Sequence, residues 1–201
     1  MNILHLNSSP RREASYSRKL GSAIVSRLQE LHPDGTVKVH DLMNPVFPHM
    51  EEVHLSSFFT PKEAHTPELT EAIKHSDGAI AALMEADVIV IEAPMYNFSI
   101  TSSLKSWIDH IARAGKTFKY TASGPEGLVK DKKVYLAIST GGIYTEGPYK
   151  PFDFTENYLR TILGFMGMSD IQVFRLEGTN MPELKESAVT KALETVKQFS
   201  F

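Results

Sequence analysis

Three short segments of the sequence, each at the end of an apolar run, carry residue types suited to ligand binding. They are residues 7–17 (NSSPRREASYS), 92–100 (EAPMYNFSI) and 139–144 (STGGIY). In an open parallel sheet, ligands bind just beyond the carboxyl ends of the strands. If the preceding runs are parallel strands, the three segments meet at one edge and form one site.

The first segment places hydroxyl groups where a helix is expected to begin. Ser9, Ser15 and Ser17 flank this point, where unpaired backbone N–H groups and the helix dipole favour an anion. The segment contains neither G-x-G-x-x-G nor G-x-x-x-x-G-K-[ST], which disfavours a dinucleotide-binding Rossmann site and a P-loop. A monophosphate held by hydroxyls and amides remains. The alternative is that Ser15 or Ser17 is only a helix N-cap.

The second segment places large side chains in a loop, where they are costly to expose to water. Its backbone and the faces of Tyr96 and Phe98 could lie along a flat heteroaromatic ring; the alternative is a packed core loop. In the third segment, Gly141 and Gly142 permit positive φ and a close approach of the backbone to a ligand. Their amides could face an electron-rich edge, although a simple turn is the alternative. Phosphate, flat ring and pyrimidine edge are together the three parts of FMN.

An alternation of strands and helices would position these segments. Strands are expected over residues 3–7, 36–41, 87–91, 133–139 and 171–175, and helices over 17–31, 67–84, 102–113, 154–165 and 181–200. Residues 42–67 contain several prolines and no clear period, and are interpreted as a long irregular excursion. The pattern predicts an α/β fold: a flavodoxin-like, doubly wound, five-stranded parallel sheet with helices on both faces, in one domain over residues 1–201.

Composition excludes several other classes of protein. The chain has no cysteine and a net charge of −3, which argues against disulfides, Cys-ligated metals and nucleic-acid binding. No signal peptide and no run long enough to span a bilayer are present, so a cytoplasmic location is expected. His49, His54 and His65 lie in the excursion without the spacing of a metal site, and no metal is expected.

Residues 93–98 (APMYNF), 124–128 (GPEGL) and the Ser139-x-Gly-Gly142 turn give the chain a close resemblance to the FMN-dependent NADH-azoreductase family, which also covers NAD(P)H:quinone reductases. The similarity runs essentially end to end. It implies a homodimer with FMN at the subunit interface, NADH or NADPH as donor, and quinones or azo compounds as acceptors. Since donor and acceptor would occupy the same exposed flavin face in turn, a ping-pong order of reaction is expected. Flavin N5 would carry out the chemistry, so no catalytic side chain is named.

The resemblance also implies roles for individual residues. The phosphate and ribityl chain would be held by Ser9, Ser15, Tyr16 and Ser17. The isoalloxazine would be bordered by Met95, Tyr96, Asn97 and Phe98, and its pyrimidine end by Ser139, Thr140, Gly141 and Gly142. The acceptor pocket would be walled by Tyr120 and Phe165. Tyr144 stands where relatives carry His, and Thr140 where some carry Arg, so both could alter donor or acceptor preference.

Three alternatives from other classes remain at this point. A flavodoxin-type electron carrier would bind FMN without substrate turnover, but carriers are usually more acidic than this chain. A hydrolase would need an activated nucleophile, and no G-x-S-x-G motif is present. A regulatory module could use FMN only structurally. The sequence leaves the choice between NADH and NADPH open.

Overall fold

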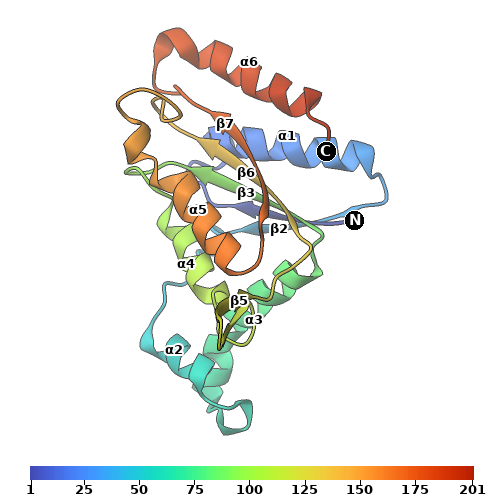
Figure 1. The fold of residues 1–201 in the computed structure, drawn as a ribbon, viewed down its shortest axis with the longest axis vertical. Helices are drawn as coiled ribbons and strands as arrows, with labels where there is room; N and C mark the ends of the chain where they lie inside the picture. The colour runs from blue at the N-terminus through green and yellow to red at the C-terminus, as the bar shows by residue number, and fades with distance from the viewer.

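A five-stranded parallel sheet forms the centre of the molecule, and helices cover both of its faces (Figure 1). The computed structural model describes residues 1–201. The strands are β1 (Asn2–Asn7), β2 (Thr36–Asp41), β3 (Val88–Pro94), β6 (Lys133–Ser139) and β7 (Asp170–Leu176). They lie in the order β2-β1-β3-β6-β7, and each pairs in parallel with its neighbours. This is the flavodoxin-like arrangement, so the predicted fold class is confirmed.

The helices form two layers because successive strand residues point to opposite faces of the sheet. Helices α1 (Tyr16–Leu31) and α6 (Pro182–Gln198) pack on one face, over a core that includes Ile3 and Val90. Helices α3 (Pro67–Glu85), α4 (Ser102–Ile111) and α5 (Phe154–Phe165) pack on the other. Every residue of the central strand β3 is buried, as a strand covered on both faces requires.

All predicted strands and helices are present, and their boundaries agree with the sequence prediction to within three residues. β6 and α5 have the predicted limits, whereas α1 begins one residue earlier than expected and α4 ends two residues earlier. β3 continues beyond residue 91 through Glu92 to Pro94, which the sequence placed in a loop. The strand continues because Glu92 finds buried polar partners, which local sequence does not reveal.

Two features were missed. The predicted irregular excursion contains α2 (Glu52–Phe59), which contacts α3 and projects from the body of the molecule (Figure 1). An antiparallel hairpin of β4 (Phe118–Thr121) and β5 (Gly124–Gly127) lies outside the main sheet. Gly and Pro are depleted in strands, so the GPEG sequence of β5 gave no strand signal. The hairpin is held by tertiary contact, since the N–H of Val129 donates to Met166 O at 2.9 Å.

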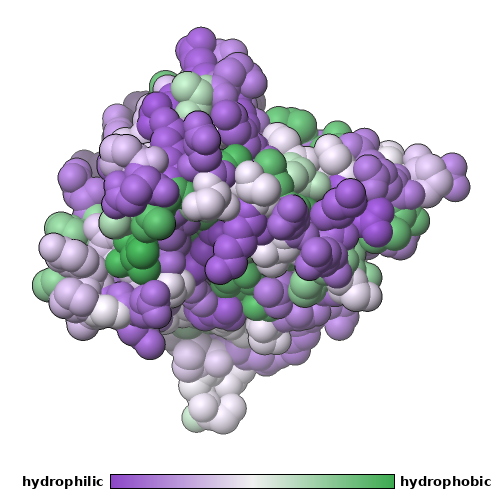
Figure 2. Space-filling model, turned by 90° about the horizontal axis from the view of Figure 1, so that it is seen from above, coloured by the Kyte–Doolittle hydropathy of each residue, from purple (hydrophilic) through white to green (hydrophobic).

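The remaining regular structure consists of short 3-10 turns at η1 (Arg12–Ala14), η2 (Lys62–Ala64) and η3 (Lys150–Phe152). Seen from above, the surface is mostly hydrophilic, with hydrophobic residues in small separate patches (Figure 2). No helix combines the length and the apolar character that crossing a membrane requires.

Candidate functional site

A cleft of about 340 Å³ lies where β1, β3 and β6 end, at the carboxyl edge of the sheet. This volume is within the range of roughly 300–1,000 Å³ that small-molecule sites occupy. The three segments singled out in the sequence converge here. The predicted cofactor residues that line the cleft are Ser9, Ser15, Tyr16, Met95, Tyr96, Asn97, Ser139, Thr140 and Gly141. Ser17, Phe98 and Gly142 are their immediate neighbours in the chain and do not line it.

The wall formed by the start of α1 is suited to an anion. Ser15 is the N-cap of the helix, and its Oγ accepts the N–H of Arg18 at 3.3 Å and lies 2.9 Å from the Oγ of Ser17. The N–H groups of Tyr16 and Ser17 have no acceptor in the protein. Ser15 therefore caps the helix, as the alternative interpretation held, while the first-turn amides remain free to donate to an anion.

The wall formed by Gly141 and Gly142 presents two further free amides. Their carbonyls accept the N–H groups of Asn180 and Gly178 at 3.0 and 3.1 Å, whereas their own N–H groups have no acceptor in the protein. Neither glycine has a positive φ, so the backbone freedom suggested by the sequence is not used. Glycine is needed at position 141 because there is no room for a side chain: an added Cβ would lie 2.6 Å from Nδ2 of Asn180.

The turn between these walls presents aromatic side chains. Tyr96 and Ser99 exchange two backbone hydrogen bonds of 2.8 and 3.1 Å, with φ of 49° at Asn97 and 71° at Phe98 between them. These values match a type I′ turn. Asn tolerates positive φ, but a bulky aromatic residue there is strained. The turn therefore holds Tyr96 and Phe98 partly exposed beside the cleft, at a cost in stability.

This strain gives the first prediction. Replacing Phe98 with Gly is expected to raise the free energy of unfolding of the ligand-free protein by about 1 kcal/mol, because Gly adopts positive φ without steric penalty. Replacing Asn97 with Gly is the matched control and should give a smaller gain, since Asn already tolerates this region. Urea unfolding followed by circular dichroism measures both. A loss of stability in Phe98→Gly would show that the ring's packing outweighs the strain.

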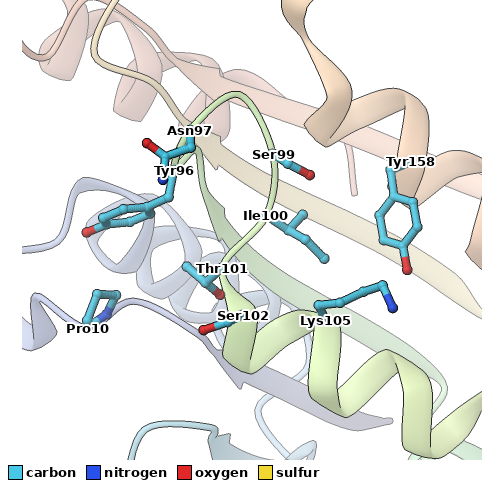
Figure 3. A pocket seen from close by; sticks show the side chains of 9 residues that line it. All are labelled: Pro10, Tyr96, Asn97, Ser99, Ile100, Thr101, Ser102, Lys105 and Tyr158. Carbon is cyan, nitrogen blue, oxygen red and sulfur yellow. The ribbon is translucent and has the colours of Figure 1, made fainter. Parts of the chain in front are cut away.

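A second hollow, of about 660 Å³, adjoins the cleft at the Tyr96–Asn97 turn. Tyr96 and Asn97 line both the cleft and this hollow. Figure 3 shows Lys105 of α4 and Tyr158 of α5 with their polar ends turned toward one another across it. Burial, helped by Asp109, raises the pKa of Tyr158 to about 12. Its hydroxyl thus stays protonated at neutral pH and can donate a hydrogen bond.

The three predicted acceptor-pocket residues lie in two places. The ring of Tyr144 lies 6.4 Å from that of Phe98, beside the aromatic turn. Tyr120 lies on the β4–β5 hairpin. Its ring centroid is 5.6 Å from that of Phe118, and the ring centroid of Phe165 is 4.6 Å from that of Phe118 on the same hairpin. Neither Tyr120 nor Phe165 lines the cleft of its own chain.

Four residues that line the cleft were not predicted from the sequence: Arg11, Pro94, Thr179 and Asn180. Thr179 and Asn180 follow β7, a strand whose loop was not considered. Because β7 is parallel to β6, its carboxyl end lies at the same edge. The polar sequence around Gly178 could have revealed them.

An ion-pair cluster anchors the loop that carries Tyr144. The carboxylate of Glu177 accepts the N–H groups of Tyr144 and Thr145 at 2.8 and 3.2 Å. Arg175 pairs with Glu177, with Asp153 at the N-cap of α5, and with Glu156 in the first turn of that helix. Burial opposes the charge of Arg175, but these carboxylates outweigh it and hold its pKa above the ordinary value.

The three histidines considered in the sequence make separate hydrogen bonds. Nδ1 of His54 accepts the N–H of Glu51 at 3.1 Å, His65 lies 3.0 Å from Thr60 O, and His49 lies 3.0 Å from the hydroxyl of Ser106. No group of three or more His, Asp or Glu side chains is arranged to hold a metal ion.

Comparison with known proteins agrees with this geometry. A family model described as flavodoxin-like fold matches residues 1–199. The FMN-dependent NADH:quinone oxidoreductase of Herminiimonas arsenicoxydans is 46% identical over 98% of this chain and 97% of its own. The FMN-dependent NADH:quinone oxidoreductase of Nostoc sp. is 44% identical over 98% of this chain and 97% of its own.

Solved structures give the same result. The azoreductase of Bacillus anthracis str. Sterne superimposes with a TM-score of 0.90 at 32% identity, covering 98% of this chain and 96% of its own. An FMN-dependent NADH-azoreductase of Bacillus anthracis str. Ames Ancestor, solved in complex with FMN, has a TM-score of 0.86 at 27% identity, with 98% of both chains covered.

Proposed function

The chain belongs to the flavodoxin-like family of FMN-dependent NADH:quinone oxidoreductases, and from this premise we propose that it binds FMN and transfers electrons from a reduced nicotinamide to quinones and azo compounds. Residues 1–201 would form one FMN-binding domain. A cytoplasmic location stays a prediction from the sequence.

The observation that carries the proposal is that unpaired donors lie in one cleft or directly beside it. The free amides of Tyr16 and Ser17 suit the phosphate, and those of Gly141 and Gly142 suit the pyrimidine edge. The aromatic turn at Tyr96 lies between them and suits the flat ring. Each donor set satisfies a different part of FMN, so the residues present fit the cofactor.

Bound FMN would supply the two-electron chemistry, accepting hydride from NADH or NADPH and passing it to the acceptor. The protein's part is to bind, orient and exclude water. The carbonyl groups of residues 140–142 accept hydrogen bonds from the N–H groups of residues 178–180, which fixes the backbone of this turn. The N–H groups of Gly141 and Gly142 can therefore act as preorganised donors toward a negatively charged pyrimidine edge. Donor and acceptor would use the same exposed face in turn, which gives a ping-pong order.

The test is direct. The purified protein should show a flavin absorbance spectrum or acquire one when FMN is added. Anaerobic NADH or NADPH should bleach it, and a quinone should restore it over many turnovers. A flavodoxin-type electron carrier would not be bleached rapidly by NADH alone. Flavin that is bound but never reduced would favour a structural use of FMN, and a protein without affinity for FMN would refute the proposal.

The positions of Tyr120 and Phe165 support a homodimer with the acceptor pocket at the subunit interface. Neither residue reaches the cleft of its own chain. Tyr120 is 74% exposed on the β4–β5 hairpin, so its ring is available for contact with a second copy of the chain. A second copy would bring its hairpin to the cleft of the first.

Complementation in mixed dimers is the test of a shared pocket. Tyr120→Ala alone should retain FMN and lose quinone turnover, whereas a cleft variant such as Gly141→Val should lose FMN. Mixing the two after reversible dissociation should restore part of the activity, because one of the two sites then receives Tyr120 from one subunit and an intact cleft from the other. If Tyr120 served the cleft of its own chain, mixing would restore nothing.

A further inference from the structure

A buried charged cluster lies on the α1 side of the sheet and has no part in the function described so far. Glu92 of β3 is fully buried, and its Oε1 lies 2.9 Å from Nε2 of His5 on β1. Its Oε2 has no hydrogen-bond partner and lies 3.8 Å from Nε of Arg18. Arg18 also pairs with Asp41 at the end of β2, at 3.2 Å. A buried carboxylate is costly unless such partners surround it.

The cluster contacts both segments that border the proposed phosphate position. Arg18 lies in the first turn of α1, and its N–H donates to the Oγ of Ser15. On the other side, the hydroxyl of Ser8 donates to the carbonyl oxygen of Glu92 at 2.6 Å. Ser8 directly precedes Ser9, which lines the cleft. Glu92 therefore connects the end of β1 to the start of α1.

The close packing of α1 on this cluster depends on Gly21. A Cβ at this position would lie 2.7 Å from Cγ of Glu92 and 3.2 Å from Nε2 of His5. Both distances are shorter than ordinary van der Waals contact, so any larger residue would displace the helix or the buried pair. The helix is thus held against the cluster by shape as well as by charge.

We propose that Glu92 is a positioning residue for FMN: its carboxylate, through Arg18, holds the serines and free amides at the start of α1 in the geometry that binds the phosphate, while its backbone carbonyl holds Ser8 beside them. The inference rests on the proposed function. By charge alone, a carboxylate here would weaken the binding of a phosphate. If Glu92 acts by positioning these groups, removing its charge should weaken FMN binding. If it acts only by charge, the same substitution should strengthen FMN binding.

The experiment compares FMN with riboflavin, which has the same ring system but no phosphate. Dissociation constants are measured by flavin fluorescence for Glu92→Gln and Gly21→Ala. In both variants FMN should bind about 10-fold more weakly, as when supporting partners of a binding site are lost, with riboflavin affinity unchanged. Gly78→Ala in α3 is the matched control for Gly21→Ala, since an added Cβ there meets nothing within 4 Å. It should change neither constant.

Each outcome decides the matter. Tighter FMN binding in Glu92→Gln would mean that the cluster acts by charge, and an equal loss for both ligands would mean that it supports only the fold; either overturns the inference. Should Glu92→Gln be too unstable to measure, Gly21→Ala carries the test, because it keeps every charge. Absence of FMN binding by the unmodified protein would refute the proposed function instead.

Discussion

Replacing Arg175 with Met is expected to lower the free energy of unfolding by about 3–5 kcal/mol at neutral pH. Arg175 lies on β7 with its side chain largely buried, and it donates to Glu156 at 2.6 Å as well as to Asp153 and Glu177. Removal of the guanidinium would leave three carboxylates facing one another in a partly dry environment. Breaking a buried ion pair from one side is costly because the remaining charge keeps its desolvation penalty.

The pH dependence of stability gives this prediction a second readout. Burial opposes ionisation of Glu156, but hydrogen bonds from Arg175 and Arg160 outweigh it and hold the Glu156 pKa below the ordinary value of 4.5. A carboxyl whose pKa is lowered by folding stabilises the protein above its unfolded pKa, and this contribution is lost as the pH falls through the folded pKa. In the unmodified protein, the contribution of Glu156 to the free energy of unfolding should disappear below about pH 4.5. In Arg175→Met, the free energy of unfolding should fall by a smaller amount on acidification.

The matched control is Arg160→Met. Arg160 bonds the same Glu156 at 2.7 Å, but its side chain is 43% exposed. Exposed pairs contribute little, so this variant should cost less than about 1 kcal/mol. Urea unfolding at neutral and acidic pH measures all three proteins. Equal effects of the two arginine substitutions would contradict the claim that burial makes Arg175 important.

The largest expected effect on ligand binding comes from Gly141→Val, which should weaken FMN affinity by about 100-fold. The added Cβ would lie 2.6 Å from Nδ2 of Asn180, a residue that lines the cleft. Either Asn180 moves into the space for the ring, or the Gly141–Gly142 turn moves away from its hydrogen bonds to residues 178–180. Both displace the amides that would contact the pyrimidine edge.

A glycine of α5 provides the control for this substitution. Gly164 is exposed, and an added Cβ meets nothing within 4 Å, so Gly164→Val should leave FMN binding unchanged. Fluorescence titration with FMN and with riboflavin measures the effect; unlike the variants of the buried cluster, Gly141→Val should weaken both ligands. Normal FMN affinity in Gly141→Val would refute the placement of the pyrimidine edge at this turn.

The sequence by itself determined the sheet and the three segments of the site. Continuous β-branched runs such as that of β3 are typical of strands covered on both faces, and the alternation of strands and helices favours a parallel sheet. Parallel strands bring their carboxyl ends to one edge, so serines, aromatic residues and glycines far apart in the chain could be expected together.

Tertiary structure alone decided the rest, because the deciding contacts join residues distant in sequence. The predicted end of β3 was wrong at Glu92, since only its burial against His5 and Arg18 lets a charged residue continue a central strand. Asn180 enters the cleft because β7 pairs with β6. Tyr120 does not line the cleft of its own chain because its hairpin packs on α5. Local pattern reports propensity and periodicity, whereas these placements depend on which surfaces the folded chain brings into contact.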